Sequence, residues 1–122
     1  MEHNEITGTI VSAAIKVHTV LGPGLLESVY KACLHHELVK RGLSVTREQP
    51  VPVQYDGVQF EMGFRMDLLV ENSVIVEVKA AKANPVHEAQ LLSHVRLTRT
   101  RIGLLLNFHV VSMKDGIKRM LD

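Results

Sequence analysis

The sequence contains a single cysteine, Cys33, and no tryptophan among its 122 residues. One cysteine excludes an intrachain disulfide and a zinc site built from several cysteines. Cys33 falls on the apolar side of a predicted helix, so we interpret it as a packing residue rather than a reactive thiol. No apolar run is long enough to span a bilayer, and the first five residues carry acid where a signal peptide carries base. We therefore expect a cytoplasmic protein that does not enter a membrane.

The chain also lacks a strong excess of either charge, because its formal net charge is +1. Tight nucleic-acid binders are usually clearly basic, so total charge alone does not indicate a polyanionic partner. The distribution is more informative, since Arg96, Arg99 and Arg101 cluster while acidic residues are spread over the first two thirds of the chain. This cluster, together with Lys82, is either ordinary solvated surface or a basic approach for a phosphate backbone.

The length and composition are typical of one globular domain. Of the 122 residues, 46% are hydrophobic and 22% are charged. A chain of this length and composition can form one hydrophobic core but is too short for two independent cores. The sequence has no internal repeat, low-complexity tract or linker, so we interpret residues 1–122 as a single domain with one site.

Hydrophobic spacing predicts two helices in the first third of the chain. Apolar residues recur at helical intervals over residues 6–21 and again over residues 25–41. Gly22-Pro23-Gly24 is expected to end the first helix, and Gly42 to end the second.

After the second helix the pattern changes to strands. Short apolar runs are broken by Pro50, Pro52 and Asp56-Gly57, and the last of these predicts a tight hairpin. Pro52 suggests that its strand lies at a sheet edge. Two further strands are expected over residues 64–70 and 74–80, joined by a short polar turn.

The last third of the chain predicts three more elements. Pro85 suits the first turn of a helix over residues 85–97. The apolar run over residues 102–108 favours a strand that is buried on both faces, and a short amphipathic segment over residues 116–121 follows it. Two N-terminal helices, a β-meander, a helix and a buried strand predict a mixed α/β domain.

Two opposite charges stand in an otherwise apolar strand. Because residues two apart share a face of a strand, Glu77 and Lys79 are expected to point the same way. Asp67 lies on the preceding strand, which the tight turn makes a natural neighbour. Charges in a central strand are costly unless they are paired or bind an ion. A salt bridge at an exposed strand end is the alternative interpretation.

Carboxylates from two adjacent strands can bind one Mg²⁺ or Mn²⁺ ion, with water and a backbone carbonyl completing an oxygen shell. Such an ion lowers the pKa of a bound water and neutralises charge on a phosphate. Lys79 is then placed to orient the attacking water or to stabilise the phosphoryl oxygens. Asp67, Glu77 and Lys79 therefore suit phosphodiester hydrolysis.

This spacing, Asp67 followed by Glu77-x-Lys79, resembles the PD-(D/E)XK nuclease superfamily, which has the restriction-endonuclease-like fold. The segment Gly24-Leu25-Leu26-Glu27-Ser28-Val29-Tyr30 resembles the motif of the GxxExxY protein family. The phrases around it are also similar to that family, and the likeness extends from about Leu21 to the C-terminus. The resemblance implies this fold and a nucleolytic site.

The resemblance also implies roles for single residues. Asp67 and Glu77 match the metal-binding carboxylates and Lys79 the motif lysine, while Glu27 matches a helix acid near the metal. Gln90 matches a glutamine on the helix after the Glu-x-Lys strand. The sequence departs from the pattern in two places, with Met66 where the superfamily name has proline and His94 where related exonuclease-like members usually have tyrosine.

Simpler interpretations exist for several of these residues. Glu27 in the first turn of a helix interacts favourably with the helix dipole, and Gln90 could be a solvated helix residue. Tyr30 is better interpreted as a packing residue than as a nucleophile. The seven histidines show none of the compact spacings of a zinc site.

These observations lead to one main hypothesis and two alternatives. The main hypothesis is a nuclease that uses Mg²⁺ or Mn²⁺ and acts on DNA or RNA. The alternatives are a catalytically silent nucleic-acid-binding or assembly module on the same fold and a purely structural subunit. We also expect a homodimer, because small domains with a long edge strand often dimerise to bury surface.

Overall fold

Two helices begin the chain in the computed structural model, which describes residues 2–122. Helix α1 spans His3–Leu21 and helix α2 spans Glu27–Lys40, so both predicted helices are present. The turn between them contains Gly22 and Gly24 with φ angles of 70° and 99°. Positive φ angles favour glycine, so these two residues allow the chain to turn between the two helices.

Five strands form one mixed sheet in the order β1-β2-β3-β4-β5. Their bounds are Val45–Tyr55, Val58–Val70, Val74–Lys79, Ile102–Asn107 and Ile117–Leu121. All neighbouring pairs are antiparallel except β3 and β4, which are parallel and are connected through helix α3, Pro85–Thr98. The predicted mixed α/β fold is confirmed, and the arrangement is consistent with a restriction-endonuclease-like fold.

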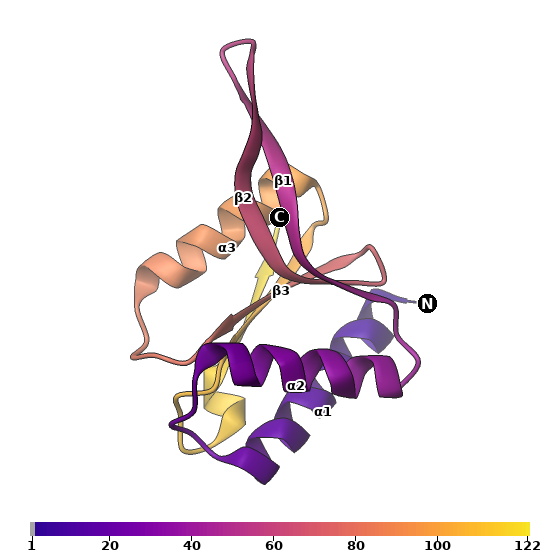
Figure 1. Cartoon of the computed structure of the whole chain (residues 1–122), viewed down its shortest axis with the longest axis vertical. Coiled ribbons are helices and arrows are strands. Elements are labelled where there is room, and N and C mark those ends of the chain that lie inside the picture. Colours follow the sequence, from indigo (N-terminus) through magenta and orange to yellow (C-terminus); the bar gives the residue numbers. More distant parts are fainter. Residues whose placement is uncertain (1) are drawn as a thin grey trace.

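Strands β1 and β2 are longer than the sequence suggested. Strand β1 continues through Pro50 and Pro52, and β2 unites what the sequence analysis treated as two runs. Both prolines are tolerated because β1 is an edge strand and pairs only with β2. Asp56 and Gly57 have φ angles of 51° and 76°, as a tight hairpin turn requires. The hairpin projects from the body of the molecule (Figure 1).

The C-terminal amphipathic segment is a fifth strand. A short 3₁₀ turn, Met113–Gly116, precedes β5, which pairs antiparallel with β4. Strand β4 therefore has a neighbour on both sides, and all six of its residues are buried, as its apolar sequence predicted.

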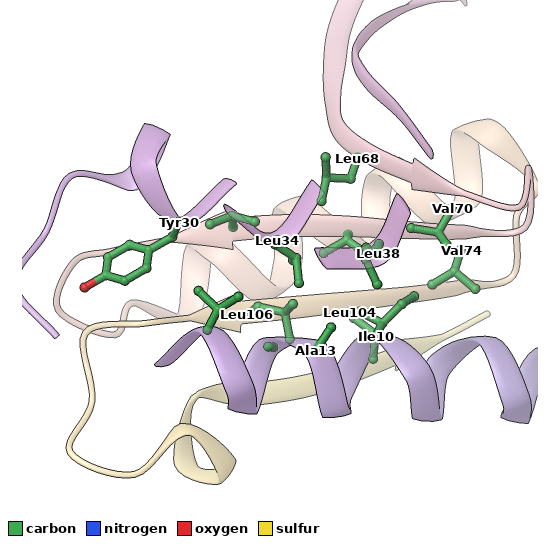
Figure 2. Close-up of a cluster of buried hydrophobic side chains, with 14 of the residues drawn as sticks. Ile10, Ala13, Tyr30, Leu34, Leu38, Leu68, Val70, Val74, Leu104 and Leu106 are labelled. Atoms are coloured by element: carbon green, nitrogen blue, oxygen red, sulfur yellow. The ribbon is translucent and has the colours of Figure 1, made fainter. Parts of the chain in front are cut away.

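The helices pack on both faces of the sheet. Helices α1 and α2 cover one face and form the larger core, in which Leu34, Leu38 and Leu104 are almost completely buried (Figure 2). Helix α3 covers the other face and contributes Leu91 and Val95 to a smaller core. The sheet therefore places strand β3 between two layers of helix. Among residues 2–122, no helix is both long and apolar enough to cross a membrane.

Candidate active site

Strand β3 carries the candidate site on the face that is covered by α3. Val76 and Val78 belong to the larger core beneath α1 and α2, whereas Ile75 belongs to the smaller core beneath α3. Because side chains alternate along a strand, Glu77 and Lys79 face the same side as Ile75. The sequence pattern predicted this shared face.

Asp67 lies where strand β2 separates from β3. The backbone ladder between these strands ends at the Leu68–Val76 pair. Asp67 is the next residue of β2 beyond this pair. Its Oδ2 accepts a hydrogen bond of 2.8 Å from the backbone N–H of Val78 on β3. The carboxylate thus replaces a strand–strand contact and holds β2 against β3. The Asp67 carboxylate is also near enough to Glu77 for its charge to raise the pKa of that carboxyl group.

Glu77 is 7% exposed, and a side chain of helix α3 contacts its carboxylate. Its Oε1 lies 3.0 Å from Nδ1 of His94 on α3, and the His94 ring stacks on Phe64 with centroids 4.0 Å apart. Burial raises the pKa of Glu77, the His94 hydrogen bond opposes that rise, and the charge of Asp67 adds to it. His94 is therefore a partner of a site carboxylate, a role the sequence analysis did not assign to it.

The raised pKa of Glu77 predicts a pH-dependent stability in the absence of metal. The pKa of Glu77 is higher in the folded state than in the unfolded state, so the folded state binds the proton more tightly. The stability of the fold therefore falls as the pH rises from the unfolded pKa through the folded pKa of Glu77. Glu77→Gln should therefore stabilise the metal-free protein by about 1 kcal/mol near pH 8, with the gain shrinking towards pH 4. Thermal unfolding in a chelator at several pH values measures this. The exposed Glu61→Gln is the control, and a gain that is independent of pH would refute the assignment.

Lys31 is a residue of this site that the sequence analysis missed. Its Nζ lies 3.1 Å from Oδ1 of Asp67 and 2.7 Å from Oε1 of Glu48 on β1. Burial would lower the pKa of Lys31, but hydrogen bonds to Glu48 and Asp67 and their charges outweigh it and raise the pKa. The only local signal is its position four residues after Glu27, which places both on one face of α2.

Lys79 is the last residue of β3 and is half-buried. Its backbone is fixed on one side, because Lys79 pairs in register with Asn107 and its carbonyl accepts a hydrogen bond from the N–H of Phe108. Within residues 2–122, no side chain forms an ion pair with its ammonium group. The group is thus available to a bound anion.

Two other predicted site residues are on helices. Glu27 and Gln90 are both exposed, on α2 and α3 respectively. Residues 2–122 contain no cluster of three or more His, Cys, Asp or Glu side chains placed to hold one ion. The metal-binding role that the resemblance implies for Glu27 stays a prediction, and the Glu27 side chain lies in the exposed first turn of α2.

The four predicted basic residues are exposed, and Lys82 lies apart from the three arginines. Lys82 is in the turn that follows β3, near Lys79. Arg99 and Arg101 lie in the turn before β4, whose first residue pairs with Val74 at the opposite end of β3. Arg96 forms an ion pair of 3.1 Å with the carboxylate of Asp122. Lys82 is the one closest in sequence to the carboxylates.

The donor atoms suit a small hard cation. Asp67 and Glu77 offer carboxylate oxygens from two adjacent strands, and Mg²⁺ is usually held by one or two carboxylates while it keeps several waters. Within residues 2–122, His94 is the one histidine that forms a hydrogen bond with either carboxylate, so the donors around the site are mainly oxygens rather than nitrogen or sulfur. The two carboxylates fit Mg²⁺ or Mn²⁺.

The chain was compared with models of known protein families. The model for a family described as the PD-(D/E)XK nuclease superfamily matches residues 4–120, which is nearly the whole chain. No curated protein and no solved structure matches the chain. Nucleases of this superfamily are typically dependent on a divalent metal.

Proposed function

This chain belongs to the PD-(D/E)XK nuclease superfamily, and on that premise we propose that it is a metal-dependent nuclease that hydrolyses phosphodiester bonds of DNA or RNA. The observation that supports this most strongly is the convergence of the Asp67 and Glu77 carboxylates from two strands, with Lys79 on the same face as Glu77. Within the superfamily we propose the GxxExxY family, on the basis of the segment from Gly24 to Tyr30.

The proposed chemistry gives each side chain one task. When bound, Mg²⁺ or Mn²⁺ supplies an activated water and neutralises charge on the phosphate. Asp67 and Glu77 hold the cation, and His94 orients the Glu77 carboxylate through its hydrogen bond. Lys79 donates to a phosphoryl oxygen or orients the attacking water.

The remaining predicted residues are assigned to the hydration of the cation and to the substrate. Glu27 lies one helical turn from Lys31 and is proposed to contact a water of the metal shell. Gln90 lies one turn from His94 on α3 and is proposed to contact the substrate. Lys82, Arg96, Arg99 and Arg101 would lower the cost of bringing a polyanion to the protein surface.

The direct test is cleavage of a mixed panel of single- and double-stranded DNA and RNA with Mg²⁺ or Mn²⁺. Cleavage by the wild type that a chelator abolishes supports the proposal. A folded protein that cleaves none of the substrates overturns it. If the same protein binds nucleic acid and Asp67→Ala leaves that binding intact, the silent binding module is the correct alternative.

We also propose that the protein is a homodimer that associates through the β1–β2 hairpin. Opposed residues of an antiparallel pair share a face, and the register pairs Val53 with Phe60 and Tyr55 with Val58. Tyr55 is 76% exposed and Phe60 is 53% exposed, so this face presents an apolar stripe to solvent. An uncharged stripe can meet its own copy about a two-fold axis without charge repulsion. The prolines of β1 disfavour edge-to-edge pairing as the alternative.

The homodimer predicts a mass of twice 13.6 kDa by light scattering at micromolar concentration. Phe60→Glu should give monomers, because two buried carboxylates would meet across the axis. Gln59→Glu is the matched control, since Gln59 lies on the other face of the same strand. A monomeric wild type at these concentrations would contradict the dimer.

A further inference from the structure

Lys31 places a positive charge where the proposed nuclease site should receive a cation. Its ammonium group lies 3.1 Å from Oδ1 of Asp67, and the Lys31 side chain is only 14% exposed. Two cations cannot share this carboxylate closely without repulsion, which water screens poorly at a partly buried site. Because Oδ2 of Asp67 already accepts a hydrogen bond from Val78, a metal ion that approaches this carboxylate would compete with Lys31 for Oδ1.

We propose that Lys31 is a positioning residue that competes with the divalent cation for Asp67 and so sets the metal concentration at which the site fills. The inference rests on the proposed nuclease function. Without metal, the ammonium group neutralises Asp67 and keeps two facing carboxylates from destabilising the sheet. With metal, it leaves Asp67 and stays on Glu48.

Glu48 provides the second position that this exchange needs. Its Oε1 lies 2.7 Å from Nζ of Lys31, closer than the Asp67 oxygen, and its side chain is 42% exposed. The local backbone is irregular, because Glu48 has a φ of 57° and falls between the Arg47–Leu68 and Gln49–Met66 pairs of the ladder. A non-glycine residue with a positive φ costs conformational energy, and it persists only where the surrounding structure holds it in place. The distortion places Glu48 within reach of α2.

The first test is calorimetric titration of the full chain with Mg²⁺ alone and with Mn²⁺ alone. Lys31→Met should bind each ion about tenfold more tightly than the wild type, since a competing charge is gone. Lys31→Arg keeps the charge and should bind with nearly the wild-type affinity. Lys40→Met removes a charge from the exposed end of the same helix and is the matched control, with an expected change below about twofold. Thermal unfolding verifies that each variant is folded.

A double-mutant cycle tests the part assigned to Glu48. Glu48→Gln leaves Asp67 as the only carboxylate partner of Lys31, so it should weaken metal binding by about threefold to tenfold. In the Lys31→Met background the same change should have an effect below about twofold. Equal weakening in both backgrounds would show that Glu48 acts on the cation directly and would overturn the exchange.

The outcomes also separate this inference from the nuclease proposal. If the wild type binds metal and Lys31→Met binds it equally or more weakly, the role of Lys31 is refuted while the nuclease proposal stands. If neither the wild type nor any variant binds metal, both are refuted. Tighter binding by Lys31→Met alone supports the competition.

Discussion

Asp67→Asn is expected to lower the metal-dependent cleavage rate by about 10³-fold, because loss of a metal ligand removes several kcal/mol of transition-state stabilisation. The asparagine oxygen can still accept the hydrogen bond from Val78, so the strand contact is retained and the fold should persist. Lys79→Ala should cause a loss of about 10²-fold or more, since it removes one donor to the reacting phosphate. Initial rates at saturating Mg²⁺ on the best substrate of the panel measure both effects.

The control for this prediction is Asp56→Asn in the hairpin turn. Asp56 is exposed and has a φ of 51°, a conformation that asparagine also accepts. This variant should keep wild-type activity. A cleavage rate that Asp67→Asn leaves within about tenfold of the wild type would show that the activity does not depend on this carboxylate.

Tyr30→Ala is expected to destabilise the fold by about 3–5 kcal/mol. Tyr30 is completely buried, and its ring stacks on Phe108 with centroids 4.5 Å apart. Its hydroxyl donates to the carbonyl of Gly22 at 2.5 Å and accepts from the N–H of Leu25 at 3.1 Å. The side chain therefore attaches the turn between α1 and α2 to the core. Chemical denaturation of the variant measures the loss.

Tyr30→Phe separates this structural role from a chemical one. It keeps the ring and removes only the hydroxyl, so the expected cost is about 1–2 kcal/mol. The folded variant should cleave at nearly the wild-type rate, because the hydroxyl is occupied by the turn. A loss of activity as large as that of Asp67→Asn, with stability unchanged, would instead make Tyr30 a participant in the reaction.

The part of the site that the sequence predicted depends on local geometry. The turn of residues 71–73 joins β2 to β3 directly, so a strand pattern alone brings Asp67 beside Glu77. The alternation of β3 places Glu77 and Lys79 on one face in the same way. Both inferences need only the alternation of side chains along a strand and a short turn between two strands.

The part that the sequence did not predict depends on contacts between distant segments. Lys31 reaches Asp67 and Glu48 only because α2 packs across the sheet, and no local spacing announces that packing. His94 reaches Glu77 because α3 crosses the opposite face. The role of Glu27 was predicted from the family resemblance alone, and the structure shows its side chain exposed in the first turn of α2.

Strand β5 was missed for a different reason. Its apolar residues Ile117, Met120 and Leu121 are spaced by three and one, which fits a helix as well as a strand. The strand is defined by its pairing with β4 rather than by alternation of its own side chains. Edge strands with a solvated face often lack a clear periodicity in this way.

A crystal structure of the protein with Mn²⁺, in which anomalous scattering locates the ion, would test the proposed metal site without an activity assay. We expect one ion between the carboxylates of Asp67 and Glu77, with metal–oxygen distances of about 2.0–2.4 Å and the Lys31 ammonium displaced from Asp67. An ion bound elsewhere, or no ion at millimolar Mn²⁺ in a crystal that leaves these side chains accessible, would contradict it.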